Sequence, residues 1–247
     1  MRELQIKFFI LSLLFLLYFT ADAQSTELNS ISDSSVINNM INIYEKEIGQ
    51  QSHLYNGKEY QNYAYRFREG NPFFIWDTWQ KGNVSYDGTL YKDIFMLYDI
   101  VRDEVVIQHF NNISRINLSK SKVASFTLPG HTFIHISPDS IHSSFIKNGF
   151  YELLYAGKDS LLAKRTKDMQ ILYRATAAEL KVFGRQIYYL KKDDKYYPVN
   201  NEHSFLRLFD YNKKEIRKYK KLNKLNYKKD PENTMVKIMS YNDQLTN

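Results

Sequence analysis

The chain has no cysteine, and glycine and proline are scarce, at 9 and 5 of 247 residues. The absence of cysteine excludes disulfide scaffolds, thiolate metal sites, thiol nucleophiles and lipidation through cysteine. The scarcity of glycine and proline excludes collagen-like and low-complexity chains. What is abundant is apolar and aromatic: 43% of the residues are hydrophobic, with 20 tyrosines and 16 phenylalanines, which is enough for a packed core.

The first 23 residues have the pattern of a signal peptide. Arg2 and Lys7 make a positive start, and an apolar run of 12 residues follows, within the roughly 7–15 of a signal-peptide core. It is shorter than the roughly 20 residues of a membrane-spanning helix. Because Ala21-Asp22-Ala23 is a small-x-small site, we expect cleavage after Ala23, with an uncleaved N-terminal anchor as the alternative.

We therefore expect export to the periplasm or the cell exterior, with no transmembrane segment left after cleavage. An exported chain without cysteine fits a bacterial envelope better than a eukaryotic secreted protein of this size, which would more often carry disulfides.

The mature chain is predicted to be an α+β protein with segregated elements. Residues 24–35 are polar and serine-rich and indicate a flexible leader, and apolar spacing of three and four predicts a helix over 36–48. The domain organisation that we expect is a helix plus antiparallel β domain over 36–200 and a Lys-rich helical segment over 201–247, packed on the same domain.

Short apolar runs at regular spacing predict one continuous antiparallel β meander, as a curved sheet or a partly open barrel. Two segments, Tyr55-Asn-Gly-Lys-Glu-Tyr60 and Tyr86-Asp-Gly-Thr-Leu-Tyr91, each predict a hairpin with a two-residue type I′ turn. Further hairpins are predicted at Gly157–Asp159 and Lys192–Asp194. The helix-forming residues at 175–183 predict a short helix instead. The predicted strands are 83–86, 90–100, 105–110, 113–118, 122–128, 132–136, 150–156, 160–164, 171–174, 187–190 and 195–199.

The pattern returns to helical after Pro198. Asn212 is a candidate helix cap, and Asp230-Pro231-Glu232 has the three features of a helix start: a capping Asp, Pro at the first position and an acid in the first turn. The buried face of this last helix is predicted to hold Met235, Ile238, Met239 and Leu245.

The formal charge of +7 comes from one segment. Residues 213–229 carry nine cations and one acid, so the rest of the chain is close to neutral. Such a patch suits an anionic surface of lipid head groups or glycans, and a solvated helix face is the alternative. Because lysine dominates and export separates the chain from nucleic acid, we expect no nucleic-acid partner. The cations are Lys213, Lys214, Arg217, Lys218, Lys220, Lys221, Lys224, Lys228 and Lys229.

The search for chemistry yields no catalytic, cofactor-binding or metal-ligating residue. No nucleophile elbow, zinc-binding helix or phosphate-cradling glycine loop occurs. His131 and His135 are four apart, but on the predicted strand they would lie about 13 Å apart, too far for one ion, and nothing requires His142 to join them.

Two other groups have both a structural and a functional interpretation. Asp99, Asp103 and Glu104 flank a predicted turn, where acids are common, although paired carboxylates also suit glycoside hydrolysis. The aromatic segment at residues 73–79, which holds Trp76 and Trp79, suits either core packing of a two-sided strand or stacking on a sugar or peptide.

Five segments resemble a family of exported proteins of the Bacteroidota that has no known activity. They are Tyr55-Asn-Gly-x-x-Tyr60, Gly70-Asn-Pro-Phe-Phe74, Tyr86-Asp-Gly88, Leu97-Tyr-Asp99 and Lys224-Leu-Asn…Lys228-Lys-Asp230. The resemblance covers nearly the whole mature chain. It implies export and supplies no catalytic residue.

Three functions remain open from the sequence. The first is a non-catalytic binding or structural protein of a bacterial envelope. The second is an envelope enzyme whose site is assembled from dispersed residues. The third is a module that associates with a surface through residues 213–229.

Overall fold

The computed structural model describes residues 36, 37, 39, 40, 43, 53–137, 145–174, 177–209 and 212–246. The chain divides into two units, residues 1–50 and residues 51–247, and the strands and helices named below belong to the second unit. The predicted signal peptide, the leader over 24–35 and most of the helix predicted over 36–48 lie outside the described residues, so they stay predictions.

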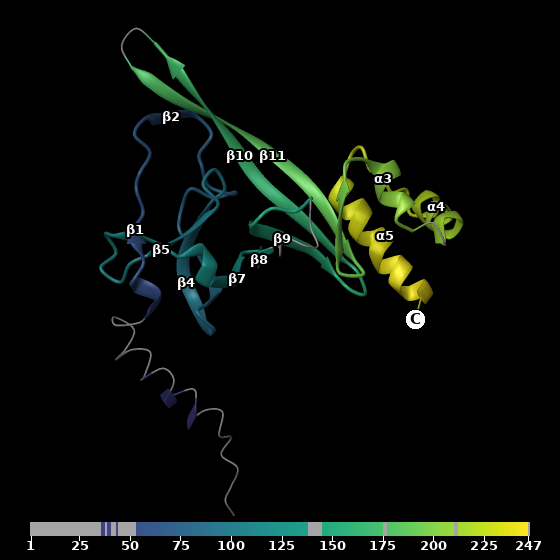
Figure 1. The fold of residues 1–247 in the computed structure, drawn as a ribbon, viewed down its shortest axis with the longest axis horizontal. Helices are drawn as coiled ribbons and strands as arrows, with labels where there is room; N and C mark the ends of the chain where they lie inside the picture. The colour runs from purple at the N-terminus through teal and green to yellow at the C-terminus, as the bar shows by residue number, and fades with distance from the viewer. Residues whose placement is uncertain are drawn as a thin grey trace, which may run out of the picture. The chain divides into compact units, whose positions relative to one another are not determined.

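The second unit is mostly β, with one open sheet of 12 strands and helices toward its C-terminal end (Figure 1). This confirms the expectation of a β-rich chain with C-terminal helices. The strands are β1 (Lys58–Glu59), β2 (Arg66–Glu69), β3 (Gln80–Tyr86), β4 (Thr89–Asp99), β5 (Glu104–Gln108), β6 (Arg115–Asn117), β7 (Val123–Leu128), β8 (His131–Ile136), β9 (Gly149–Ala156), β10 (Ser160–Tyr173), β11 (Ala178–Lys192) and β12 (Lys195–Val199). The helices are α3 (Glu202–Arg207), α4 (Lys213–Leu222) and α5 (Pro231–Thr246).

The sheet consists of two antiparallel meanders rather than the single continuous one that we predicted. The strand order is β1-β6-β5-β4-β3-β7-β8-β9-β10-β11-β12. After β6 the chain crosses back, so that β7 pairs with β3. Strand β2 lies off this path and pairs with β11 in parallel. Neither the β3–β7 pairing nor the β2–β11 pairing could be predicted from local sequence, because hydrophobic alternation indicates a strand but not the strand with which it pairs.

One of the two predicted tyrosine-flanked hairpins is confirmed and the other is wrong. Asp87 and Gly88 have φ angles of 51° and 79°, as the turn between β3 and β4 requires. The first segment forms no hairpin, since β1 pairs with β6 and Gly57 has no positive φ. A Cβ on Gly57 would lie 2.5 Å from Ile116 Cγ2, so this glycine permits a close approach between strands.

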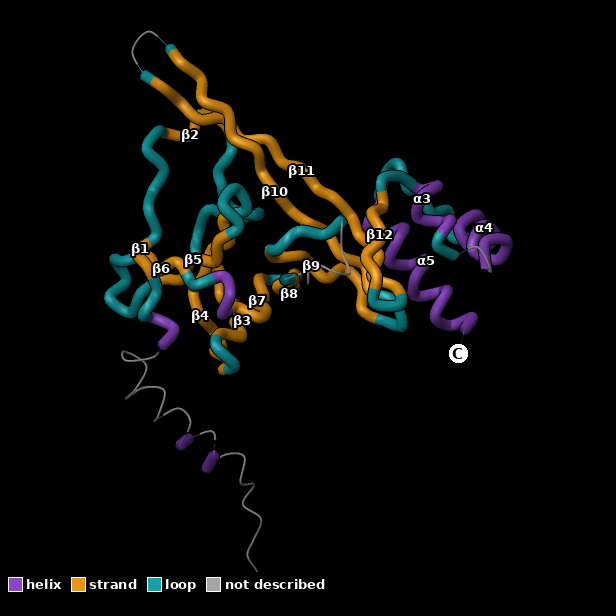
Figure 2. The backbone as a smooth tube through the Cα atoms, viewed as in Figure 1, coloured by secondary structure: helices purple, strands orange, loops and turns teal. Residues whose placement is uncertain are grey.

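Strands β10 and β11 form one long hairpin, which the sequence did not predict (Figure 2). The segments predicted as separate strands at 160–164 and 171–174 belong to the single strand β10, which pairs with β11 from Ser160↔Lys191 to Tyr173↔Ala178. The short helix predicted over 175–183 is therefore wrong from Ala178 onward. The ladder with β10 and the added pairing with β2 override the helix propensity of residues 177–180. The hairpin around Asp193 and Asp194 is confirmed, with φ angles of 48° and 57°.

The two largest of four hydrophobic clusters in the described residues stabilise this arrangement. The first is aromatic and lies among β3 to β9, where the Phe126 and Phe133 rings stack at 4.8 Å and the Tyr98 ring packs edge-on against both. The second lies between the inner part of the β10–β12 sheet and the C-terminal helices. Its buried residues include Leu161, Leu190, Val199, Phe205, Ile216, Met235, Ile238 and Met239.

The start of α5 is the one predicted from sequence, while the start of α4 differs in one contact. The Asp230 carboxylate accepts a hydrogen bond from the Asn233 backbone N–H at 3.2 Å. Asn212 precedes α4, but its side chain donates to Asn242 on α5 instead of capping α4. Of the residues predicted to face the core from α5, Leu245 is 42% exposed and does not.

Candidate functional site

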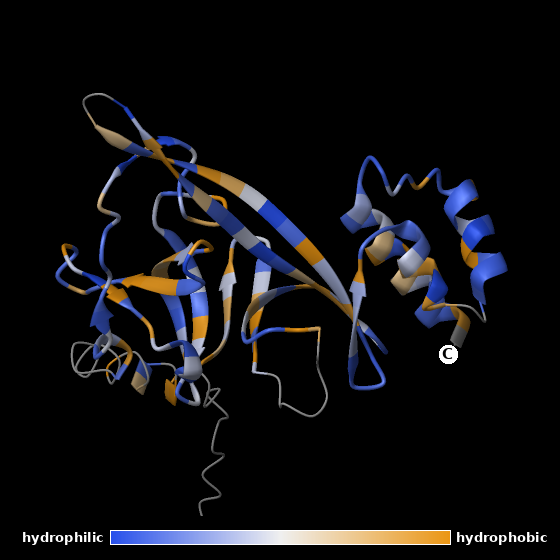
Figure 3. Ribbon diagram, turned by 45° about the horizontal axis from the view of Figure 1, so that its top comes forward, coloured by the Kyte–Doolittle hydropathy of each residue, from blue (hydrophilic) through white to orange (hydrophobic). Residues whose placement is uncertain are grey.

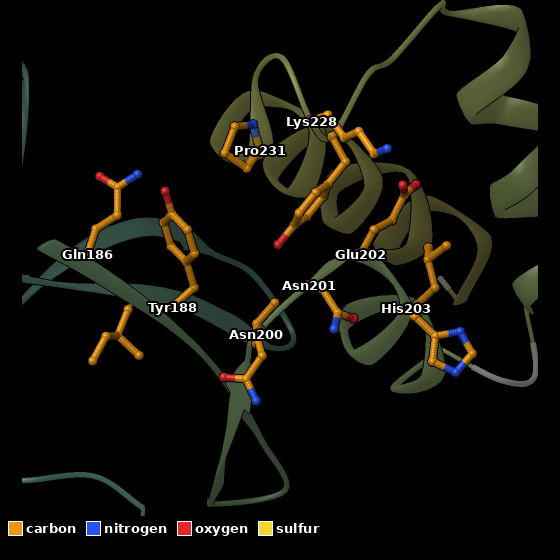
Figure 4. A pocket seen from close by; sticks show the side chains of 12 residues that line it. Gln186, Tyr188, Asn200, Asn201, Glu202, His203, Lys228 and Pro231 are labelled. Atoms are coloured by element: carbon orange, nitrogen blue, oxygen red, sulfur yellow. The ribbon is translucent and has the colours of Figure 1, made fainter.

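A pocket of about 840 Å³ lies beside the C-terminal helices and is here called the amide pocket. Three segments form its walls: the inner part of β11, the connection from β12 into α3, and the approach to α5 (Figure 4). Its lining residues are Gln186, Ile187, Tyr188, Val199, Asn200, Asn201, Glu202, His203, Leu206, Tyr227, Lys228 and Pro231.

Tyr188 is held in place from behind the amide pocket. Its hydroxyl donates to the Glu232 carboxylate at 2.7 Å, and burial together with this acceptor raises the pKa of Tyr188. The same carboxylate accepts two hydrogen bonds from Arg165, at 2.7 and 3.0 Å. Such a two-point Arg–carboxylate contact fixes geometry as well as charge, so the Tyr188 ring forms a rigid wall.

Arg165 joins this wall to the sheet. Its Nε donates to Glu152 at 2.6 Å, and the Glu152 side chain is only 5% exposed. Burial would lower the pKa of Arg165, but Glu232 and Glu152 raise it instead. His131 contacts the other Glu152 oxygen, so two carboxylates, a guanidinium and an imidazole form one continuous network.

Among the polar side chains of the amide pocket, the Tyr227 hydroxyl and the Asn200 amide make no side-chain hydrogen bond to the rest of the described chain. Burial and the nearby Glu202 carboxylate raise the pKa of Tyr227, so its hydroxyl stays protonated and able to donate. A ligand can form hydrogen bonds with these two groups without breaking a hydrogen bond within the protein.

Charge in the amide pocket is balanced. Glu202 and Lys228 are the two lining residues with formal charges of opposite sign. Glu202 is ion-paired with Lys220 of α4, so its carboxylate is occupied. The remaining polar groups are the amides of Gln186, Asn200 and Asn201, the two phenols and His203. The Gln186 and Asn201 side-chain oxygens already accept hydrogen bonds within the chain, and the Tyr188 hydroxyl donates to Glu232. The remaining groups of this set can donate and accept hydrogen bonds while the surrounding aliphatic side chains supply apolar contact.

A second hollow, of about 530 Å³, lies between α3, α4 and the loop after α4, and it is basic. Arg217, Lys220, Lys221 and Lys224 line it, with Glu202 as its acid. Figure 3 shows α4 almost entirely in hydrophilic colours, and Ile216 is its buried apolar residue. Four cations of the segment predicted to meet an anionic surface thus gather at one hollow.

The two histidines that we predicted to lie apart on one strand have different partners in the structure. His131 and His135 both lie on β8. His131 contacts Glu152, whereas His135 contacts the Asn148 side chain at 2.8 Å. His142 lies outside the described residues. Among the residues that the structure describes, no group of three or more His, Asp or Glu is placed to hold a metal ion.

Asp99 does more than occupy a turn. One carboxylate oxygen accepts the backbone N–H groups of Val101 and Arg102, as turn acids do. The other accepts the hydroxyls of Tyr60 and Tyr63, both at 2.8 Å, and the side chain is fully buried.

Asp103 is the centre of a second, partly buried contact group. It accepts from Tyr98 at 2.6 Å, Lys164 at 2.8 Å and Lys120 at 2.9 Å. Burial would raise the pKa of Asp103, but these three donors hold it below its usual value. Both acids are saturated with donors, which favours a structural role over a catalytic one. Glu104, the third acid of the predicted cluster, pairs with Asp99 through the β4–β5 ladder.

The aromatic segment is not the two-sided strand that we predicted. Residues 71–79 form bends and irregular backbone, with a single bridge from Phe73 to Asp99. Phe73, Phe74, Trp76 and Trp79 nevertheless pack against the cores, while Ile75 is 49% exposed. The packing interpretation therefore fits better than an exposed stacking surface.

The amide pocket could not be predicted from the sequence, because its residues come from three segments that are separated along the chain. Asn200-Asn201 was the only local signal, since two adjacent amides follow a strand and precede a helix. Comparison of the chain with family models, curated proteins and solved structures finds no match. No helix in the described part of the chain is long and apolar enough to span a bilayer.

Proposed function

We propose that this protein is a non-catalytic binding protein of a bacterial envelope, and that it holds a neutral, hydroxyl-rich ligand such as a sugar chain in the amide pocket. The observation that carries the proposal is the lining: three side-chain amides, two tyrosines and balanced charge around about 840 Å³. A hydroxyl both donates and accepts, as an amide does, and a tyrosine face packs against the apolar face of a sugar ring.

The state of the acids favours binding over catalysis. Glu202, which lines the pocket, is ion-paired with Lys220, and Glu232 behind the wall is bound by Arg165 and Tyr188. Acid–base catalysis needs a carboxyl group free to exchange a proton with the substrate. An envelope enzyme with a dispersed site remains the alternative, and turnover of any bound oligosaccharide would favour it.

Binding can be tested by calorimetric titration with neutral oligosaccharides of glucose, mannose and N-acetylglucosamine. We expect one of these oligosaccharides to bind with saturation. Tyr227→Ala should weaken the affinity for that oligosaccharide by about tenfold or more, because the variant loses the hydrogen bond and the ring contact of Tyr227. Tyr65→Ala is the matched control, because Tyr65 is a 43% exposed tyrosine outside the pocket. Failure of every oligosaccharide to bind, or equal affinity for both variants, would contradict the proposal.

Export is part of the proposal, and the support for it is the sequence of residues 1–23. Fractionation of the source cells and N-terminal sequencing of the protein test it. A mature chain that begins at Gln24 and lies outside the cytoplasm is the expected result. A full-length cytoplasmic chain would contradict it.

The basic hollow supports a second candidate, association with an anionic surface. Its support is the gathering of Arg217, Lys220, Lys221 and Lys224 around one hollow. Replacing Arg217, Lys221 and Lys224, the exposed cations of this hollow, with glutamine should reduce pelleting with anionic vesicles and leave binding in the amide pocket unchanged. Unchanged pelleting would exclude this second function.

A further inference from the structure

The outer part of β10 presents an open edge with apolar side chains. Strand β9 pairs with β10 only as far as Ala163, so from Asp168 to Tyr173 the described chain places β11 on one side of β10 and no strand on the other. Met169, Ile171 and Tyr173 are 41%, 39% and 80% exposed. The stretch Met169–Tyr173 holds no charge, proline or glycine, which are the usual protections of an edge strand.

The direction of the free backbone groups is fixed by the ladder. In an antiparallel pair, successive residues point their N–H and C=O groups alternately toward the partner strand and away from it. The Lys167 N–H points away from β11, since it donates to the Ile100 carbonyl, and the Arg174 N–H points toward the β11 side, to Ala177. Hence Met169, Ile171 and Tyr173 direct their backbone groups to the open edge.

We propose that two copies of this chain pair through this edge, with a two-fold axis at Ile171. Antiparallel pairing about that residue places Ile171 opposite the partner's Ile171, and Met169 opposite the partner's Tyr173. All three outward-facing positions then fall in hydrogen-bonded pairs, which gives about six backbone hydrogen bonds. Met–Tyr and Ile–Ile contacts on one face cover the side chains that are exposed in the single chain.

The charges agree with the same register. Pairing about Ile171 places Asp168 opposite the partner's Arg174 at both ends of the ladder, where each would join an exposed ion pair within its own chain, Asp168 with Arg185 and Arg174 with Glu179. These are non-hydrogen-bonded positions, where opposite side chains lie closest. Pairing about Met169 would lose both ion pairs and would require the Lys167 N–H to leave the Ile100 carbonyl. The interface is small, so the dimer is expected to be weak, with a dissociation constant of about 10 μM to 1 mM.

Sedimentation over a concentration series tests the proposal. We expect concentration-dependent dimers in the full mature chain, and their loss in Ile171→Lys, which places two like charges across the axis. Phe183→Lys is the matched control: Phe183 is 45% exposed on the same hairpin but on its opposite face, so this variant should still dimerise. A chain that stays monomeric at millimolar concentration, or equal dimerisation of both variants, overturns the proposal.

The register has its own tests. Because the chain has no cysteine, Ile171→Cys provides a single thiol, and a hydrogen-bonded pair brings the two Cα atoms to about 5.5 Å, within disulfide reach. We expect mild oxidation to cross-link Ile171→Cys and not Phe183→Cys. Asp168→Arg and Arg174→Asp should each weaken dimerisation, and the double variant should restore it. Equal cross-linking, or no restoration, would exclude this register.

Discussion

The two halves of the β10–β11 hairpin have the same backbone ladder and opposite surroundings. In the inner half, Leu161, Ala163 and Leu190 are fully buried against the C-terminal helices. In the outer half, Met169, Tyr173 and Phe183 are 41–80% exposed, and Leu180, where β2 joins β11, is the buried exception. The comparison teaches that backbone pairing sets the form of the hairpin, whereas side-chain burial decides how strongly each half is held.

The arginines of the hairpin repeat this contrast. Arg165 is 13% exposed and binds Glu152 and Glu232, while Arg185 is 63% exposed and binds Asp168 at 2.6 Å. A buried carboxylate that loses its partner pays its full desolvation cost, whereas an exposed one returns to water.

The largest expected effect follows from the inner arginine. Arg165→Ala leaves Glu152 buried without its guanidinium, and we expect the free energy of unfolding to fall by about 3–5 kcal/mol. Arg185→Ala should lower it by less than about 1 kcal/mol. Urea denaturation of both variants measures the difference. Equal losses would show that the two halves are supported in the same way.

Truncation of apolar side chains should separate the halves next. Leu161→Ala creates a cavity in the second core and should cost about 2–5 kcal/mol. Ile171→Ala removes a 39% exposed side chain and, in dilute solution where chains are single, should cost about 1 kcal/mol or less. Thermal and urea unfolding measure both. A costly Ile171→Ala in dilute solution would mean that the outer half is buried by something within the chain.

The smallest expected effect concerns acid. Burial would raise the pKa of Glu232, but Arg165 and Tyr188 hold it below its usual value of about 4.3. Its ionised form therefore stabilises the fold above that value, and this contribution is lost as pH falls through the lower folded pKa. Glu232→Gln should flatten the fall in stability below about pH 4.3, as followed by urea unfolding at a series of pH values. A Glu232→Gln variant that keeps the wild-type slope would contradict this prediction.

How much of this could be predicted depends on how local each signal is. Asp87-Gly88 and Asp230-Pro231-Glu232 act within a few residues, so the β3–β4 hairpin and the start of α5 were correctly predicted. Asn56-Gly57 is a similar local signal, but the strand that follows it pairs with β6, which is remote in sequence, and forms no hairpin.

The candidate sites differ in the same way. The Lys-rich segment could be predicted because its charged residues are close together in the sequence. The amide pocket could not, because Gln186, Asn200 and Tyr227 meet only after β11, α3 and the approach to α5 have packed. Asp99 and Asp103 were correctly placed at a turn, but their tyrosine and lysine donors could not be read from spacing.

The parallel pairing of β2 with β11 has a consequence for the order of folding. Arg66 pairs with Glu179, which follows it 113 positions later, whereas β3 and β4 close across a two-residue turn. A chain that emerges from its N-terminus can form the β3–β6 meander early, but β2 has no partner until β11 is made. Contacts between residues so far apart in sequence require the closure of a long loop, which is entropically unfavourable and slows folding. Attachment of β2 is therefore expected to be a late step, and a chain truncated before β11 would leave Arg66–Glu69 as an unpaired strand.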